Sequence, residues 1–174
     1  HSVTLIAGPV CLPSPAGVTR VDVISAQEMY EAVRVALPAA EAAVFSAAVA
    51  DYRPAEVAVQ KIKKTAGDLT LRLERTPDIL GSVRSVFHWQ GFLAGFAAET
   101  ENLAGHADGK LRSKQCDLIV ANDVSQPGIG FDASENEVTL FFRDGRVESL
   151  PRMSKDAVAQ RIVAAVESAV RKSG

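Results

Sequence analysis

Short apolar runs of strand length alternate with helix-like segments along most of this 174-residue chain. The clearest runs are residues 3–7, 44–49, 91–98 and 117–122, and each is bounded by polar or turn-forming residues. Runs this short and this apolar are typical of strands that are buried on both faces of a parallel sheet. The helical segments between them supply the crossovers that parallel strands need. The pattern predicts an α/β fold, a Rossmann-like three-layer sandwich with a mostly parallel sheet and added antiparallel hairpins.

Helix starts and turns are marked by short polar signals. Residues 25–28 match the capping box S-x-x-E in front of a helix that ends before Pro38. Thr76-Pro77-Asp78 predicts a second helix start with Thr76 as the cap, and a polar helix is expected from residue 102 to about residue 115. Ser154 is expected to cap the last helix. The apolar face of that helix would consist of Val158, Ile162, Val163, Val166 and Val170.

Two hairpins and one further strand complete the predicted elements. Residues 57–63 and 69–74 flank Ala66-Gly67-Asp68, and residues 137–142 and 146–150 flank Asp144-Gly145. Residues 19–24 are rich in β-branched side chains and predict a strand, whereas residues 126–132 predict a glycine-rich loop.

Composition limits the classes of function. The formal net charge is −2 and only 6% of the residues are aromatic, which argues against a nucleic-acid binder. No apolar run approaches the length of about 20 residues that a membrane-spanning helix needs. Cys11 and Cys116 are the only two thiols, as expected of a reduced, cytoplasmic protein. The length fits one domain spanning residues 1–174.

Polar residues follow several of the predicted strands, and ligands of open parallel sheets bind outside the carboxyl ends of the strands. These strand-end residues are Asp51, Glu99, Asn122 and Asp123. Lys61-Ile62-Lys63-Lys64 follows the first of them and places three ammonium groups within four residues. Such a cluster fits a polyphosphate with a divalent ion held by a carboxylate, although taken alone it is more often a solvated surface turn.

Three further groups have both a structural and a functional interpretation. The predicted helix start at residues 76–79 either is a simple cap or offers its free amides to an anion or to the edge of a base. Phe96 either packs in the core or stacks on a ring. Lys110 and Lys114, one helical turn apart, either form a solvated face or bind phosphate.

Taken in order, these segments closely resemble those of phosphopantothenoylcysteine synthetase, which in bacteria is usually the C-terminal half of a bifunctional coenzyme A biosynthesis protein. The resemblance covers essentially the whole chain. It is carried by residues 47–54 (AAVADYRP), 61–64 (KIKK), 76–80 (TPDIL), 95–100 (GFAAET), Lys110, Lys114 and residues 117–123 (DLIVAND).

The resemblance implies a ligase that joins 4′-phosphopantothenate to L-cysteine at the expense of CTP, with Mg²⁺. In such an enzyme the substrate carboxylate attacks the α-phosphate, which gives an acyl-cytidylate and pyrophosphate, and the cysteine amine then displaces CMP. By resemblance Lys61 is the catalytic lysine that stabilises the triphosphate, and Asp51 is a nucleotide-site residue and the expected Mg²⁺ ligand. The full set of CTP-binding residues implied is Phe45, Ser46, Ala47, Asp51, Lys61, Pro77, Asp78, Ile79, Leu80, Phe96, Lys110 and Lys114.

One part of the family pattern is missing. Nothing in the chain matches the first βα unit, with the Asn-x-Ser-Ser-Gly-Lys segment that holds phosphopantothenate. We therefore expect a chain truncated by roughly forty residues at its front, which is inactive or impaired alone. The family also implies a homodimer, and a decarboxylase domain in the full-length protein. Residues 131–142, with Val138, Leu140 and Phe142 exposed, are the expected pairing surface; an ordinary hairpin packed on its own core is the alternative.

A second class of function remains open from sequence, namely a non-catalytic nucleotide-binding module or an NAD(P)-binding Rossmann-like module. Against a dehydrogenase, no G-x-G-x-x-G follows a strand, and against a P-loop kinase, no Walker A motif is present. Eukaryotic relatives use ATP, so the choice of CTP depends on the resemblance of residues 78–80 to bacterial members.

Overall fold

The structure is a computed structural model that describes residues 1–64, 67–99, 102–123 and 133–173. Its internal contacts divide the chain into two compact units, which are described separately. The first consists of His1–Val33 and Ala48–Ile79, and the second of Arg34–Ala47 and Leu80–Gly174. The expectation of a single domain remains a prediction. None of the helices in the described ranges is long and apolar enough to cross a membrane.

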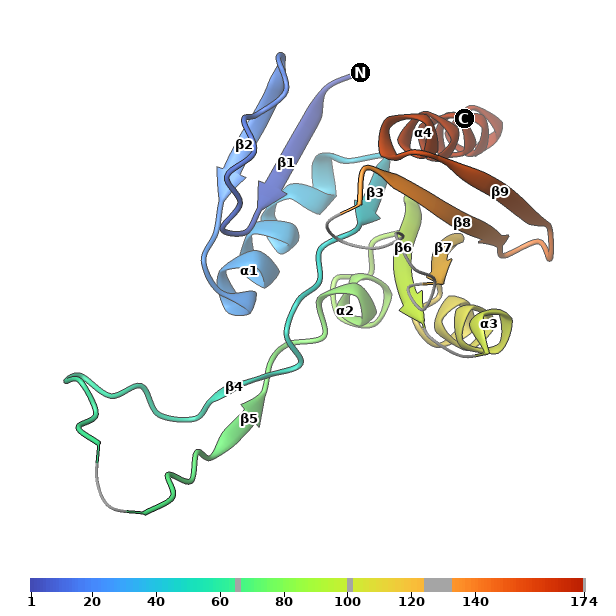
Figure 1. The fold of residues 1–174 in the computed structure, drawn as a ribbon. Helices are drawn as coiled ribbons and strands as arrows, with labels where there is room; N and C mark the ends of the chain where they lie inside the picture. The colour runs from blue at the N-terminus through green and yellow to red at the C-terminus, as the bar shows by residue number, and fades with distance from the viewer. Residues whose placement is uncertain (65–66, 100–101, 124–132, 174) are drawn as a thin grey trace. The chain divides into compact units, whose positions relative to one another are not determined.

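A five-stranded mixed sheet forms the centre of the second unit (Figure 1). Its order is β3 (Ala42–Phe45), β6 (Phe92–Glu99), β7 (Leu118–Asp123), β8 (Glu135–Phe142) and β9 (Val147–Ser154). The pairs β3–β6 and β6–β7 are parallel, whereas β7–β8 and β8–β9 are antiparallel. The hairpin predicted around Asp144-Gly145 is therefore confirmed, and it extends the parallel part of the sheet.

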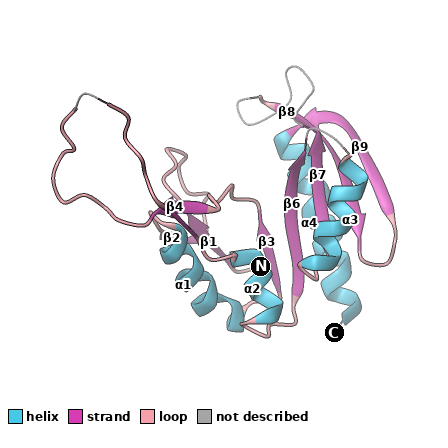
Figure 2. Cartoon of the chain, turned by 90° about the horizontal axis from the view of Figure 1, so that it is seen from below, coloured by secondary structure: helices cyan, strands magenta, loops and turns pink. Residues whose placement is uncertain are grey.

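Helices cover both faces of this sheet, as Figures 1 and 2 show. α4 (Lys155–Ser173) packs on one face, where Val158 and Ile162 join a cluster with Leu118, Val120 and Leu140. α2 (Ile79–Ser85) and α3 (Leu103–Ser113) cover the other face. The backbone N–H of Ala157 donates to Ser154 Oγ at 3.2 Å, so the predicted cap of α4 is confirmed. The three-layer α/β fold predicted from sequence is confirmed.

The first unit contains a parallel strand pair, a helix and a narrow antiparallel ribbon. β1 (Val3–Ala7) pairs with β2 (Val18–Asp22), and α1 (Ala26–Ala36) follows. The last residues of α1, from Arg34, and the 3₁₀ turn Leu37–Ala39 belong to the second unit. The capping box is present, because the Glu28 N–H donates to Ser25 Oγ and the Ser25 N–H to the Glu28 carboxylate. The ribbon consists of β4 (Tyr52–Pro54) and β5 (Leu73–Arg75).

Several sequence-based boundaries were wrong. The strand expected over residues 44–49 ends at Phe45, and the hairpin expected over 57–63 and 69–74 instead pairs Tyr52–Pro54 with Leu73–Arg75. An ion pair explains the ribbon's register: Arg53 and Glu74 are opposite each other, with Nε and Oε1 2.8 Å apart. Three lysines within residues 61–64 repel one another and disfavour pairing nearer the turn.

Three further expectations changed or lie outside the described part. Thr76 does not cap α2, because its hydroxyl donates to the Ala50 carbonyl at 2.5 Å and the helix begins at Ile79. Val163 is 54% exposed and does not belong to the buried face of α4. The loop expected over residues 126–132 lies outside the described residues.

Candidate functional site

One group of the predicted site residues gathers in the second unit around β6. Lys110, on α3, extends its side chain to the sheet, and Nζ donates to the Phe96 carbonyl oxygen at 2.6 Å. Both residues are half-buried. An ammonium group has three donors, so this bond fixes the position of the charge while two donors remain for other acceptors.

The neighbouring strand contributes Asn122, which ends the apolar run of β7. Asn122 is paired with Ala98, and Val120 with Phe96, so the side chains of Phe96 and Asn122 emerge on the same face of the sheet. Asn122 Oδ1 is buried and accepts no hydrogen bond from the residues that the structure describes. A buried amide oxygen without a donor is costly, and a ligand with an N–H or O–H group would satisfy it.

The opposite face of β6 contacts α2. A Cβ atom built on Gly95 would lie 2.9 Å from Leu80 Cδ2 and 3.2 Å from Ile119 Cδ1. Gly95 is paired with Phe45, the last residue of β3. The absence of a side chain at Gly95 therefore lets Leu80 pack directly against the sheet, close to where Phe45, Ser46 and Ala47 leave it.

A second group of predicted site residues gathers in the first unit. The Thr76 N–H donates to the Asp51 carbonyl at 3.0 Å, and the Thr76 hydroxyl donates to the Ala50 carbonyl. These two bonds hold Asp51 beside the segment Thr76–Pro77–Asp78. The Asp51 side chain is exposed, and its carboxylate is accessible to a cation or a ligand.

The remaining lysines have less defined surroundings. Lys61, Lys63 and Lys64 are exposed in irregular chain between β4 and β5. Lys114 is the C-cap of α3, and its backbone N–H donates to the Lys110 carbonyl at 3.0 Å. The twelve predicted residues thus divide into two groups. Asp51, Lys61, Pro77, Asp78 and Ile79 belong to the first unit; Phe45, Ser46, Ala47, Leu80, Phe96, Lys110 and Lys114 belong to the second.

Clustered metal ligands are not found in the described part of the chain. The described residues contain no group of three His, Cys, Asp or Glu side chains that could hold a metal ion. Mg²⁺ that is bound mainly by phosphate oxygens needs only one or two carboxylates, and Asp51 fits that role. The side chains of Glu99 and Asp123, two further strand-end candidates, lie outside the described part.

Cys116 is not a nucleophile in this fold. It is fully buried, and burial, together with the neighbouring Asp117 carboxylate, raises the pKa of its thiol to about 11. The thiolate that a covalent mechanism needs is therefore almost absent near neutral pH. The side chains around β6 and β7 instead offer charge and hydrogen-bonding groups, which suit binding and electrostatic stabilisation.

Two contributors to the site were not assigned from sequence. Gly95 is part of the segment GFAAET (residues 95–100), but its role in making room for Leu80 depends on a contact that sequence spacing does not reveal. Asn122 was noted as a strand-end residue but was not included among the nucleotide-binding residues. A polar side chain that ends an apolar run was the available signal.

Comparison with known proteins places the chain in a family. Residues 1–170 match the family model described as DNA/pantothenate metabolism flavoprotein C-terminal domain. The chain is 46% identical over 163 residues to the coenzyme A biosynthesis bifunctional protein CoaBC of Vibrio parahaemolyticus, and 44% identical over 165 residues to that of Escherichia coli. These alignments cover 92% and 93% of this chain, but 41% and 40% of the relatives. The chain thus spans about two fifths of the length of these curated relatives.

Solved structures show the same fold. The crystal structure of the C-terminal domain of a CoaBC protein superposes with a TM-score of 0.81 at 38% identity, over 98% of this chain and 76% of that one. A Cab2 mutant in complex with phosphopantothenate-cysteine superposes with a TM-score of 0.69 at 15% identity, over 90% and 55% of the two chains, which shows the fold alone. The chain belongs to the DNA/pantothenate metabolism flavoprotein C-terminal domain family.

Proposed function

We propose that this chain is the nucleotide-binding part of a CTP-dependent phosphopantothenate–cysteine ligase of coenzyme A biosynthesis. The observation that carries the proposal is the group Lys110, Phe96 and Asn122 at the carboxyl half of β6 and β7. Lys110 Nζ supplies a fixed cation and Asn122 Oδ1 an unsatisfied acceptor, whereas the Phe96 side chain packs against the core cluster that α4 covers. The relatives that are 44–46% identical are bifunctional coenzyme A biosynthesis proteins, which supports this choice of reaction.

The proposed chemistry is nucleotidyl transfer followed by amide formation. The phosphopantothenate carboxylate attacks the α-phosphate of CTP, the bond to pyrophosphate breaks, and an acyl-cytidylate results. The cysteine amine then attacks the acyl carbon, and CMP leaves. Such displacements at phosphorus depend on positioning and charge neutralisation more than on a covalent nucleophile. This requirement agrees with the three lysines assigned to the site, Lys61, Lys110 and Lys114.

Each residue has a proposed role. Lys61 stabilises negative charge on the triphosphate as the acyl-cytidylate forms, and Lys110 and Lys114 bind the β- and γ-phosphates. Backbone groups of residues 77–80 bind the cytosine edge. The nucleotide pocket is lined by Phe45, Ser46, Ala47 and Phe96. Asn122 Oδ1 accepts a hydrogen bond from the nucleotide. Mg²⁺ would be held by Asp51 and would neutralise phosphate charge when bound.

Further parts of the enzyme are proposed to come from outside this sequence. The phosphopantothenate-binding first βα unit has no counterpart in the chain, so we expect the 174 residues alone to bind CTP without completing the ligation. A decarboxylase domain is expected in the full-length protein, since the relatives are bifunctional and the chain covers two fifths of their length. A cytoplasmic location is part of the same proposal, because the free thiols of Cys11 and Cys116 suit a reducing compartment.

A homodimer is proposed, with a pairing surface that differs from the one expected from sequence. Val138, Leu140 and Phe142 are buried in the core, 2%, 1% and 7% exposed, so the expectation that they pair two copies was wrong. The chain between β4 and β5 instead exposes a row of apolar side chains, which a second copy would cover. These residues are Val57, Val59, Ile62, Leu69 and Leu71. Light scattering of a Val57→Asp/Val59→Asp variant tests this surface, and an unchanged dimer would refute it.

The choice of ligand tests the proposed function. CTP with Mg²⁺ should raise the melting temperature of the chain, whereas NAD⁺ and NADP⁺ should not. Calorimetry gives the CTP affinity, and mass spectrometry shows whether phosphopantothenoylcysteine forms. Stabilisation by NAD(P)⁺ without any by CTP would favour the dinucleotide-binding module instead.

A further inference from the structure

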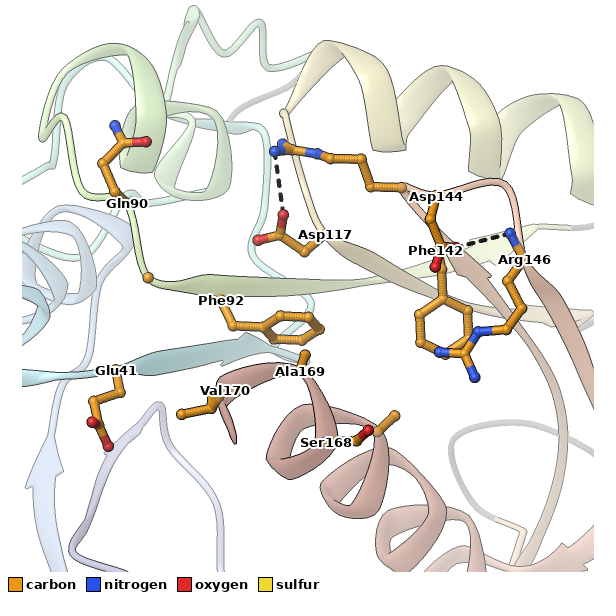
Figure 3. Close-up of a pocket in the computed structure, with 13 residues that line it drawn as sticks. Glu41, Gln90, Phe92, Asp117, Phe142, Asp144, Arg146, Ser168, Ala169 and Val170 are labelled. Carbon is orange, nitrogen blue, oxygen red and sulfur yellow. Dashed lines mark hydrogen bonds and ion pairs between the residues drawn. The ribbon is translucent and has the colours of Figure 1, made fainter. Parts of the chain in front are cut away.

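A hollow of about 650 Å³ lies in the second unit at the amino-terminal edge of the parallel strands, the edge opposite to the candidate nucleotide site. Residues at the starts of β6 and β7 line one side, the β8–β9 turn a second, and the last turns of α4 a third. Figure 3 shows the side chains that surround it. Neither the resemblance nor the proposed function gives this hollow a role.

The hollow exists because small side chains of α4 face large rings of the sheet. Earlier in the helix Val158 and Ile162 fill the space against the sheet and are buried. At the end of the helix the smaller Ala165 and Ala169 line the hollow together with Phe92, and all three stay half-buried. The hollow therefore has a floor of apolar and aromatic side chains.

Two exposed arginines bound this floor. Arg146 places its guanidinium 3.6 Å from the centre of the Phe142 ring, which fixes its position. Arg143 Nη1 lies 3.2 Å from Asp117 Oδ1. Their side chains are 56% and 53% exposed, so the charge of both faces solvent. Arg143 Nε and Nη2 also donate to the carbonyls of Cys116 and Gln115, so Arg143 contributes its charge, and Arg146 is the arginine that contacts the ligand.

The charge around each arginine favours an anion. Asp117 is shared by Arg143 and the buried Arg84, so that group carries one excess positive charge. Glu148 is likewise shared by Arg146 and Arg161, with the same excess.

Two further carboxylates line the hollow. Asp144 Oδ1 accepts a hydrogen bond from the Arg146 backbone N–H at 3.0 Å, which directs it toward its own turn. Glu41 lies on the side of the hollow away from Arg146 (Figure 3). Positive charge therefore dominates at the arginine end alone.

The geometry points to a binding site for a small aromatic acid. Its flat ring lies on the floor that Phe92 and Ala169 line, and its acid group faces Arg143 and Arg146. A guanidinium presents paired donors that suit a carboxylate, and the aromatic floor supplies the apolar burial. The site is separate from the carboxyl edge of the strands and does not depend on the proposed ligase activity.

A titration with 2-naphthoate, followed by amide resonances of the labelled 174-residue chain, tests the site. We expect a dissociation constant of about 1 mM or tighter, with shifts at Gly91, Phe92 and Ala169. Neutral 2-naphthamide should bind up to about fivefold more weakly, because it lacks the charge that the exposed arginines recognise. Arg146→Gln should weaken 2-naphthoate binding by a similar factor, whereas Arg152→Gln, which alters an arginine outside the hollow, should not.

Ala169→Phe supplies the decisive variant, because its ring would occupy the hollow. Binding of 2-naphthoate should be lost while the melting temperature and the response to CTP stay near those of the parent chain. If this variant does not fold, as judged by circular dichroism, Ala165→Leu replaces it. The proposal is overturned if 5 mM 2-naphthoate, about five times the expected dissociation constant, causes no amide shifts or causes shifts centred outside the hollow. It is also overturned if Ala169→Phe binds 2-naphthoate as well as the parent chain does, or if 2-naphthamide binds as well as 2-naphthoate.

Discussion

Lys110 and Phe96 are 14 residues apart in sequence, and the ammonium group of the lysine donates to the phenylalanine's backbone carbonyl at 2.6 Å. The bond joins α3 to β6 and fixes a positive charge beside the backbone of that strand. A charge that is already held in place loses little freedom when a phosphate arrives. The bond therefore connects the packing of the helix to the proposed binding of CTP.

Replacing Lys110 by Gln should weaken both the fold and nucleotide binding. The bond to Phe96 becomes neutral, which should lower the free energy of unfolding by about 1 kcal/mol. The phosphate contact loses its charge, and CTP affinity should fall about tenfold or more. Arg112→Gln removes a charge from the exposed side of the same helix and should change neither quantity by more than a few tenths of a kcal/mol. Urea unfolding and calorimetry measure the two effects, and equal CTP affinities in both variants would exclude the role of Lys110.

Gly95→Ala should disturb the contact that seats Leu80. The new methyl group would lie 2.9 Å from Leu80 Cδ2, so that side chain must move. We expect a loss of about 1–3 kcal/mol in stability, and weaker CTP binding because Leu80 belongs to the proposed cytosine-binding segment.

Gly109→Ala provides the matched control for this substitution. A Cβ atom there meets nothing within 4 Å, and the position lies within α3. The change should therefore stabilise the chain by about 0.4–1 kcal/mol. Parallel melting curves and CTP titrations compare the two variants. An unchanged CTP affinity in Gly95→Ala would show that Leu80 does not contact the nucleotide.

The sequence predicted the elements of the second unit well because their signals are local. Apolar runs, the Asp144-Gly145 turn and the Ser154 cap each act within a few residues, and β6, β7, the β8–β9 hairpin and α4 appear where these signals place them. The ribbon of β4 and β5 was misplaced because its register depends on Arg53 and Glu74, 21 residues apart. No local pattern contains that pairing.

The candidate site was predictable only in part for a similar reason. Strand-end polar residues and paired lysines are visible in sequence, and Lys110 and Phe96 do meet in the fold. The alternation of Val138, Leu140 and Phe142 cannot reveal what covers their face. α4, which follows later in the chain, buries them, whereas the sequence interpretation left them exposed.

Arg84 is expected to be the most sensitive charged residue for stability. Its guanidinium donates to the carbonyls of Trp89 and Gly91 and to Asp117, and its side chain is 7% exposed. Arg84→Met removes the donor to the Trp89 and Gly91 carbonyls and one of the two arginines paired with Asp117, so we expect a loss of about 3–5 kcal/mol.

Arg53→Met breaks the exposed pair with Glu74 and should cost about 0.2–1 kcal/mol. Chemical unfolding of the two variants compares the two ion pairs directly. Equal losses would show that burial of Arg84 adds nothing to its contribution.

The buried Cys116 thiol predicts a loss of stability in alkaline solution. Burial raises its pKa from 9.0 to about 11, so the folded state retains a proton that the unfolded state releases. The stabilising contribution is therefore complete below pH 9 and is lost as the pH rises toward 11. Lysines and tyrosines also titrate there, so the measurement is the difference between the parent chain and Cys116→Ala in urea at pH 8, 9 and 10. A difference that stays constant across this range would contradict the prediction.

Lys61 and Asp51 provide the last test, because each is assigned a distinct partner on the nucleotide. Lys61→Gln should lower CTP affinity and the rate of acyl-cytidylate formation together, since the lost charge faces phosphate in both the bound and the activated state. Asp51→Asn should weaken CTP binding more with Mg²⁺ present than without it, because the carboxylate is proposed to hold the ion. Lys155→Gln, at the start of α4, serves as a control of equal charge change.

These measurements need different forms of the protein. Binding is measured on the 174 residues by calorimetry with and without Mg²⁺, and the rate on a longer protein that includes the phosphopantothenate-binding unit. Equal losses for Asp51→Asn in both conditions would assign this carboxylate to the ribose or the base instead of the metal. A Lys61→Gln protein that binds and reacts like the parent would remove Lys61 from the site.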